Sequence, residues 1–320
     1  MSQTPTSTPQ TPKRICMIAG WGRYPVDVAQ ALKRQGYEVH CFGVFDHADE
    51  AALRAICTEY RTIGMCRLGK AVRYMRRHGI TDVLTLGKYF KWRLFQSFRF
   101  WRNVPDFLTF RTYAAHFLTH KKDCKDDSLM LTMARMFAKF GIRLGCPTDF
   151  VPELLVDEGI LTQTAPTEAQ WRDIRYGFQV AKELGRFDIG QTVLVSNGVV
   201  IAMEAIEGTD ACIERAGKLC SHGGLVMVKV AKPQQDMRFD VPTIGMTTLE
   251  NFAAAGGRVI AVEARKTILI AQSELLEFAN QHGIAVVAVC GAEVPPDTSD
   301  SSNGSTNGSS NDSSDGETSG

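Results

Sequence analysis

The first half of the chain alternates between short apolar runs and segments with the apolar period of a helix. Residues 15–19 form an apolar run that ends in a glycine-containing turn. A helical pattern follows, in which Pro25 suits the first turn and Gly36 the end. A second apolar run covers residues 39–44, and the alternation continues as far as residue 87. This pattern predicts βαβ connections and therefore a parallel sheet flanked by helices.

The second half has local signals of its own. Thr167 and Gln170 have the spacing of a capping box at a helix start, and two apolar runs joined by Asn197-Gly198 indicate a β-hairpin. The sequence thus predicts an α/β protein with an N-terminal Rossmann-like parallel-sheet domain at 13–146, a linker at 147–166 and a C-terminal mixed α/β (α+β) domain at 167–292. The polar ends, 1–12 and 293–320, are expected to be disordered, because they offer too little apolar surface to offset the entropy of ordering.

Composition restricts the class of protein. Hydrophobic residues make up 44% of the 320 and charged residues 22%, which is typical of a soluble protein with a substantial core. The formal net charge of +1 gives no overall attraction to nucleic acid, so no nucleic acid is expected as a partner. The nine cysteines show no CxxC pair and no zinc-type spacing, and no stretch has the pattern of a signal peptide or a membrane span. We therefore expect a cytoplasmic protein.

The glycine turn after the first apolar run is a candidate phosphate-binding loop. Gly20 and Gly22 stand at the carboxyl end of the expected strand, where backbone N–H groups and a helix N-terminus can approach a phosphate. The dinucleotide fingerprint GxGxxG is incomplete, because Pro25 stands where its third glycine would fall. A tight strand-to-helix turn without a ligand explains the pattern equally well.

Residues 88–117 combine many aromatic residues with arginines and lysines. Such a segment can stack on single-stranded nucleic acid, lie on a membrane surface, or pack as a helix whose basic side chains extend to solvent. Packing is the simplest interpretation. Contact with lipid ranks above contact with nucleic acid, because the overall charge is nearly neutral.

One carboxylate, Asp240, follows three basic residues in the segment KVAKPQQDMRFDVPTIG at 229–245. Pro242 fixes its own φ and pushes the preceding residue toward extended geometry, so Asp240 is expected beside a stiff turn. A structural ion pair and a charged catalytic site both fit this arrangement. The three basic residues are Lys229, Lys232 and Arg238.

Further acids precede two expected helices. Glu204, Glu207 and Asp210 lie close together in the sequence, and Asp210 also suits a helix N-cap. Asp126 and Asp127 are expected to complement a helix dipole, with metal binding as the lesser alternative.

Several runs of sequence together resemble one enzyme family. They are IAGWGRYP and KDDSLM in the first half, and AKELGRFDIGQ, VVIAMEAIEGTDA, VMVKVAKPQQDMRFDVPTIG and TLENFAAAGGRVIAVEA in the second. Over residues 14–291 the chain is similar to the UDP-2,3-diacylglucosamine pyrophosphatases of the LpxI type, which are unrelated to the calcineurin-like metallophosphoesterases.

The resemblance implies two domains with a lipid-linked substrate between them. It also implies a magnesium-dependent hydrolysis, with manganese as the alternative cofactor, of UDP-2,3-diacylglucosamine to UMP and 2,3-diacylglucosamine 1-phosphate in lipid A synthesis. The essential aspartate of the family falls in the motif FDVPTIG, which makes it Asp240. We therefore expect catalysis by Asp240, Lys229 and Lys232, substrate contacts from Gly20, Gly22, Arg238 and Thr243, and metal ligation by Asp240, Asp210 and Glu207.

An enzyme with such a substrate would work close to the inner membrane. We expect transient, peripheral contact with that membrane through residues 88–117, and a homodimer is a further hypothesis. The chain departs from the family pattern at two places: Trp21 stands between the glycines of the turn, and Gly87 is followed by Lys88-Tyr89 instead of Asn-Val.

Two other functions remain open on sequence alone. A nucleotide- or sugar-binding module would need no catalytic carboxylate. A Rossmann-type oxidoreductase would need the complete glycine fingerprint and an acid after the second strand, near Asp46. Binding of UDP-sugars compared with binding of NAD distinguishes these alternatives.

Overall fold

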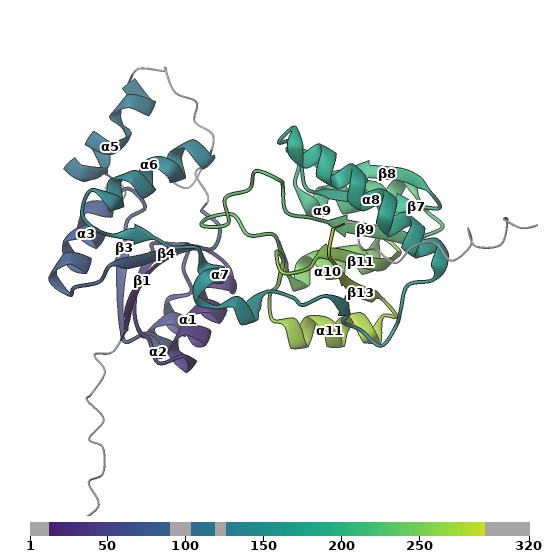
Figure 1. The fold of residues 1–320 in the computed structure, drawn as a ribbon, viewed down its shortest axis with the longest axis horizontal. Coiled ribbons are helices and arrows are strands. Elements are labelled where there is room, and N and C mark those ends of the chain that lie inside the picture. The colour runs from purple at the N-terminus through teal and green to yellow at the C-terminus, as the bar shows by residue number, and fades with distance from the viewer. Residues whose placement is uncertain (1–12, 90–103, 119–125, 292–320) are drawn as a thin grey trace, which may run out of the picture.

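The computed structural model describes residues 13–89, 104–118 and 126–291. The disorder predicted for 1–12 and 293–320 lies outside these residues, as does much of the aromatic segment. The described elements gather into two lobes, each built around one main sheet (Figure 1). The predicted α/β class is confirmed, since one sheet is parallel, the other is mixed, and helices cover both.

The N-terminal lobe contains a five-stranded parallel sheet in the order β3-β2-β1-β4-β5. Its strands are β1 (Arg14–Ala19), β2 (Glu38–Val44), β3 (Glu59–Ile63), β4 (Asp82–Leu86) and β5 (Arg143–Leu144). Its helices are α1 (Tyr24–Arg34), α2 (Glu50–Ile56), α3 (Leu68–Arg77), α5 (Phe107–Leu118) and α6 (Asp126–Ala138). The strand order reverses between β1 and β4, and in such sheets ligands bind beyond the carboxyl ends of the strands at this point.

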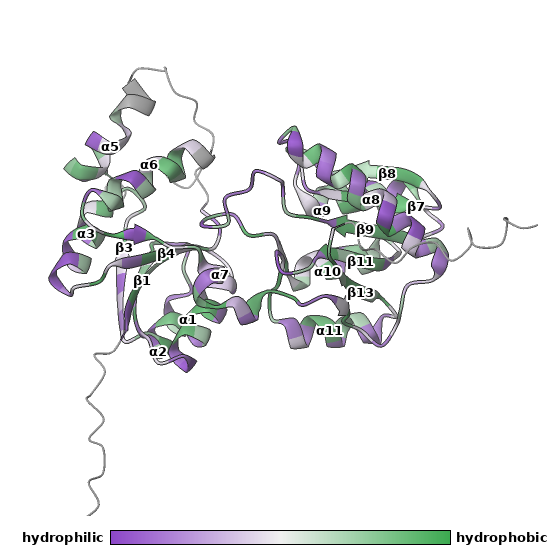
Figure 2. Ribbon diagram, viewed as in Figure 1, coloured by the Kyte–Doolittle hydropathy of each residue, from purple (hydrophilic) through white to green (hydrophobic). Residues whose placement is uncertain are grey.

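Apolar side chains on both faces of β1, β2 and β4 explain why helices cover this sheet on two sides. Ile15 and Met17 of β1 pack with α1 and α2, whereas Cys16 and Ile18 pack with α3 and α6. Figure 2 shows the same division, with hydrophobic residues along the strands and polar residues on the outer faces of helices such as α3 and α8.

The C-terminal lobe contains a six-stranded mixed sheet in the order β6-β13-β11-β9-β7-β8. The three strands β9, β11 and β13 are parallel, and the remaining three pair antiparallel. The strands are β6 (Gly159–Ile160), β7 (Thr192–Ser196), β8 (Val199–Met203), β9 (Leu225–Lys229), β11 (Gly257–Glu263) and β13 (Ala285–Val289). A small parallel pair, β10 (Thr243–Ile244) and β12 (Ile268–Leu269), lies beside it.

Helices cover both faces of this sheet as well. Helix α8 (Glu168–Arg186) packs on one face, and α9 (Thr209–Leu219), α10 (Met246–Ala254) and α11 (Gln272–Gln281) on the other. The predicted capping box of Thr167 and Gln170 begins α8. The predicted hairpin joins β7 to β8 through Asn197 and Gly198, whose φ angles of 50° and 77° are left-handed.

The two lobes touch through more than one segment. The chain passes between them through α7 (Pro147–Phe150) and the 3₁₀ turn η3 (Pro152–Leu154), and the loop after β9 reaches back toward the N-terminal lobe (Figure 1). There the Cys146 thiol donates to the carbonyl of Met237 at 3.2 Å. Within the residues that the structure describes, no helix is both long and apolar enough to cross a membrane.

Candidate active site between the lobes

The glycine turn lies where the strand order of the N-terminal sheet reverses. The N–H of Gly20 donates to the carbonyl of Leu86 at 2.7 Å, and Trp21 exchanges backbone hydrogen bonds of 2.9 and 3.0 Å with Lys88. A Cβ on Gly20 would lie 2.7 Å from the Lys88 carbonyl oxygen, so this close approach requires glycine. Gly22 has a φ of +107°, which L side chains rarely adopt. The turn therefore binds the ends of β1 and β4 together and presents Lys88 beside it.

Lys229 is a charged group at the corresponding end of the C-terminal sheet. It is the last residue of β9 and is 6% exposed. Its ammonium group donates to the hydroxyl of Thr209 at 3.0 Å, and that hydroxyl donates to Oε1 of Glu204 at 2.9 Å. Within the described part of the chain, Oε2 of Glu204 is buried without a hydrogen-bond partner.

Local backbone features hold these partners in place. The N–H of Glu204 donates to the carbonyl of Thr192 at 2.9 Å. A Cβ on Gly190 would lie 2.0 Å from the carbonyl oxygen of Glu204, so glycine is needed there. Thr209 is the first residue of α9, and Gly208 before it has a φ of +82°. Lys229 therefore meets the N-terminus of α9, where a helix favours anions.

The charges around Lys229 come from both lobes. Burial lowers the pKa of Lys229, and the ammonium group of Lys88 lowers it further, whereas the carboxylates of Glu204, Asp210 and Asp240 raise it. Lys88 follows β4 in the N-terminal lobe and is exposed, while the three acids belong to the C-terminal lobe. One cation of the N-terminal lobe and three carboxylates of the C-terminal lobe thus act on Lys229 at the end of β9.

Asp240 lies in the loop that connects β9 to β10 and is exposed. Its Oδ2 accepts a hydrogen bond of 2.7 Å from the side-chain amide of Gln235, and its N–H donates to the carbonyl of Asp236 at 3.2 Å. The neighbouring Phe239 packs against the hydrophobic core of the N-terminal lobe. Asp240 therefore belongs to a loop of the C-terminal lobe, and its neighbour Phe239 fixes that loop against the N-terminal lobe.

The remaining basic residues of this loop have acidic partners of their own. Lys232 forms an ion pair of 2.7 Å with Asp188. Arg238 binds Asp236 through Nε at 2.9 Å and Nη2 at 2.5 Å, and this contact lowers the pKa of Asp236. The structure thus brings Lys229, Asp210 and Asp240 together and directs Lys232 and Arg238 to other carboxylates. Thr243 is partly buried at the start of β10.

Comparison with known proteins agrees with the two-lobed arrangement. Residues 14–154 match the LpxI N-terminal domain and residues 157–287 match the LpxI C-terminal domain. The chain belongs to the LpxI family. It is 28% identical over 290 residues to the UDP-2,3-diacylglucosamine pyrophosphatase LpxI of Caulobacter vibrioides (strain ATCC 19089 / CIP 103742 / CB 15), a match that covers 88% of this chain and 100% of the relative. The resemblance seen in the sequence motifs is confirmed.

The predicted metal ligands of this LpxI-family chain do not form a preassembled cage. Glu207 is paired with Arg215 at 2.7 Å, and Oδ1 of Asp210 accepts from the hydroxyl of Thr248 at 2.8 Å. In the described ranges no group of three His, Cys, Asp or Glu side chains could hold a metal ion. Magnesium commonly uses one or two carboxylates together with substrate phosphates. Asp210 and Asp240 fit that mode, whereas Glu207 is already bound by Arg215.

Sequence reasoning assigns no role to Glu204, Thr209 or Lys88, although all three act on Lys229 or contact it. One signal for the first two was present. A lysine that ends an apolar strand is buried and needs a hydrogen-bond partner or a counter-charge. The acids and hydroxyls before α9, the helix that precedes β9, are among the candidates in the chain. Lys88 gave no such signal, because its position depends on how the lobes meet.

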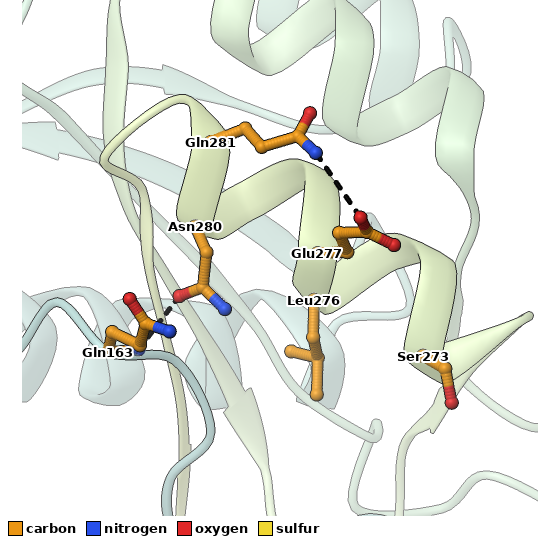
Figure 3. Close-up of a pocket in the computed structure, with 6 residues that line it drawn as sticks. All are labelled: Gln163, Ser273, Leu276, Glu277, Asn280 and Gln281. Carbon is orange, nitrogen blue, oxygen red and sulfur yellow. Dashed lines mark hydrogen bonds between the residues drawn. The ribbon is translucent and has the colours of Figure 1, made fainter.

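A separate pocket of about 520 Å³ lies on the outer face of α11 (Figure 3). The side chain of Asn280 there accepts a hydrogen bond of 2.8 Å from the N–H of Gln163. The other lining residues are Ser273, Leu276, Glu277 and Gln281. None of the six belongs to the charged group around Lys229, so this pocket is not part of the candidate active site of the LpxI-family fold.

Proposed function

We propose that this chain hydrolyses the pyrophosphate of UDP-2,3-diacylglucosamine to UMP and 2,3-diacylglucosamine 1-phosphate, as a step of lipid A synthesis. Membership of the LpxI family and the name of the Caulobacter relative support this activity. The structural observation that carries it is the charged site shared by the lobes, with Lys88, Lys229 and Asp240. Cleavage of a polyanionic pyrophosphate depends on neutralising cations and an oriented water, and this site offers groups for both.

The reaction adds one water across the anhydride. The water oxygen forms a bond to one phosphorus, the bond from that phosphorus to the bridging oxygen breaks, and the bridging oxygen leaves with the bonding electrons on the other phosphate. The water gives up a proton in the process. We assign to Asp240 the carboxylate role in this step, either as acceptor of that proton or as a metal ligand.

Cations from the two lobes would meet the phosphates. Lys88 is exposed and can contact phosphate directly, whereas Lys229 acts from a buried position. The hydroxyl of Thr209 and the carboxylate of Glu204 favour the charged form of Lys229 against the effect of burial. Lys232 and Arg238 remain predicted phosphate contacts, and each would have to exchange its present carboxylate partner for the substrate.

The chemistry of the acids fits a hard divalent cation. Magnesium or manganese, held by Asp240 and Asp210 together with phosphate oxygens, would supply further neutralising charge when bound. Gly20, Gly22 and Thr243 remain predicted substrate contacts. The N–H groups of Gly20 and Trp21 already donate to carbonyls, so neither is left to bind a phosphate.

One incubation tests the proposal. The purified protein is mixed with UDP-2,3-diacylglucosamine and Mg²⁺, and UMP is measured by chromatography. Running the reaction in ¹⁸O-labelled water identifies the attacked phosphorus, because the label appears in only one product. Binding of NAD without release of UMP would overturn the proposal in favour of an oxidoreductase, and binding of UDP-sugars without turnover would favour a binding module. Light scattering of the same sample tests the homodimer hypothesis.

A further inference from the structure

Exposed aromatic rings and exposed cations lie on two contacting helices of the N-terminal lobe. Phe107 and Phe110 of α5 are 80% and 53% exposed. They are three residues apart on a helix and therefore share a face. Helix α3 carries four exposed basic residues. We call these six residues the basic–aromatic surface: Lys70, Arg73, Arg76, Arg77, Phe107 and Phe110.

The cations of α3 differ from several basic side chains on other helices of this protein. Arg54, Arg186 and Lys218 each pair with a glutamate of their own helix. Helix α3 has the sequence LGKAVRYMRR, which contains no acid, and among the described residues none of its four cations forms an ion pair. Its apolar side chains are buried in the core, so the cations face solvent together.

Tight packing at the start of both helices fixes α5 beside α3. The N–H of Leu68 donates to the hydroxyl of Thr109 at 3.0 Å, and the N–H of Asp106 donates to the carbonyl of Cys66 at 3.1 Å. A Cβ on Gly69 would lie 2.6 Å from a carboxylate oxygen of Asp106. The starts of both helices therefore lie side by side at the edge of the N-terminal lobe (Figure 1).

Exposed phenylalanines beside unpaired cations are typical of proteins that bind at a bilayer surface. Single exposed apolar residues are common on soluble proteins and do not by themselves indicate a binding surface. Two neighbouring rings can enter the boundary between headgroups and acyl chains, while lysines and arginines bind anionic headgroups. The net charge of the whole chain is only +1, so this attraction comes from the local arrangement on α3.

We propose that the basic–aromatic surface docks this protein on anionic lipid bilayers. The rings of Phe107 and Phe110 insert at the level of the headgroups, and the cations of α3 contact the lipid phosphates. The purpose of docking rests on the proposed function, because a substrate with two acyl chains resides in a membrane. The surface itself contains no residue of the candidate active site, so docking can be measured without turnover.

Vesicle sedimentation with the full chain tests the proposal. The protein is mixed with vesicles of phosphatidylcholine, with or without phosphatidylglycerol, at low and at physiological salt. We expect binding to the anionic vesicles only, and weaker binding at higher salt. Phe107→Ser with Phe110→Ser, and separately Arg73→Gln with Arg77→Gln, should each lower the partition coefficient by about tenfold or more. The arginine pair should also flatten the salt dependence.

A matched control changes the same residue types on the other lobe. Phe187 at the end of α8 is 76% exposed and Arg172 on α8 is exposed, so Phe187→Ser with Arg172→Gln should leave vesicle binding unchanged. Circular dichroism establishes whether each variant is folded. If the variant with both phenylalanines replaced is unfolded, the variant with both arginines replaced still tests the proposal.

Three outcomes would overturn docking: no binding to anionic vesicles, variants of the surface that bind as well as the parent, or binding of single-stranded RNA in place of vesicles. UMP release from a water-soluble short-chain analogue should be unchanged in all surface variants. If the parent releases UMP but does not bind vesicles, the docking proposal is wrong and the proposed function stands. If the parent binds vesicles but releases no UMP, the proposed function is wrong and the docking proposal stands.

Discussion

The buried ammonium group of Lys229 and the hydroxyl of Thr209 are joined by a hydrogen bond of 3.0 Å. The same hydroxyl donates to Glu204, so one small side chain links a buried cation to a buried carboxylate. A charge in an apolar interior is costly unless it is paired and hydrogen-bonded. This link favours the charged form of Lys229 at the end of β9, where the proposed substrate brings phosphates.

Replacing Thr209 by valine should remove the link while keeping the volume of the side chain. We expect a loss of about 1–3 kcal/mol in the free energy of unfolding, because Lys229 and Glu204 then lose a shared partner in the interior. Turnover should fall as well, and Thr209→Ser should restore both properties. Urea unfolding and initial rates of UMP release measure the two effects. If the valine variant has the same unfolding free energy and the same rate of UMP release as the parent, Thr209 has no role in holding Lys229.

Asp240→Asn should abolish turnover without unfolding the protein. The carboxylate is exposed and accepts from Gln235, so its loss removes a charge from the site and little from the core. A rate loss on the order of 10²-fold or more is expected for a general base or metal ligand. Asp157→Asn, at an exposed position just before β6, is the control. Retention of most of the activity would show that Asp240 has no part in the reaction.

Local signals predicted the fold better than they predicted the site. The apolar runs, the capping box at Thr167 and the Asn197-Gly198 hairpin depend on neighbouring residues, and each is found in the structure. The partners of the basic residues depend on tertiary packing. Lys232 pairs with Asp188, which is 44 residues away, and the influence of Lys88 on Lys229 requires the meeting of two lobes. Sequence could name Asp240 only through the family resemblance.

The metal dependence of the variants should distinguish Asp210 and Asp240 from Glu207. We expect UMP release to stop in excess EDTA and to return with Mg²⁺ or Mn²⁺, because oxygen ligands and phosphates favour hard cations. Asp210→Asn should raise the Mg²⁺ concentration needed for half-maximal rate. Glu207→Gln should change it little, since Arg215 already occupies that carboxylate. Full activity in excess chelator, or equal effects of the two variants, would contradict this assignment.

Stability should fall in acid through His40. Its Nδ1 lies 2.7 Å from the hydroxyl of Tyr74, and burial, with a smaller contribution from His78, lowers its pKa. The folded state therefore binds this proton less readily than the unfolded chain does. Below the ordinary histidine range of about 6.5, unfolding takes up a proton and stability decreases as the pH falls; above that range the contribution vanishes.

Urea midpoints at about pH 7.5 and about pH 5 measure this dependence. His40→Gln should reduce the difference between the two midpoints. His282→Gln is the control, because His282 is exposed at the end of α11. An unchanged difference in the His40 variant would assign the acid sensitivity to other groups.

Phe239 is expected to affect turnover without taking part in the chemical step itself. Its ring packs against the core of the N-terminal lobe, while the next residue, Asp240, belongs to the loop of the C-terminal lobe. Phe239→Ala should free that loop, so that Asp240 is held less firmly between the lobes. We expect kcat to fall while the charged groups of the site remain intact, and Phe239→Leu to recover part of the rate by restoring apolar contact. Protease cleavage within residues 231–242 should become faster in the alanine variant only, with Phe187→Ala as a control for loss of an exposed ring. If the loop is cleaved faster but kcat stays at the parental value, the anchor stabilises the loop without positioning Asp240.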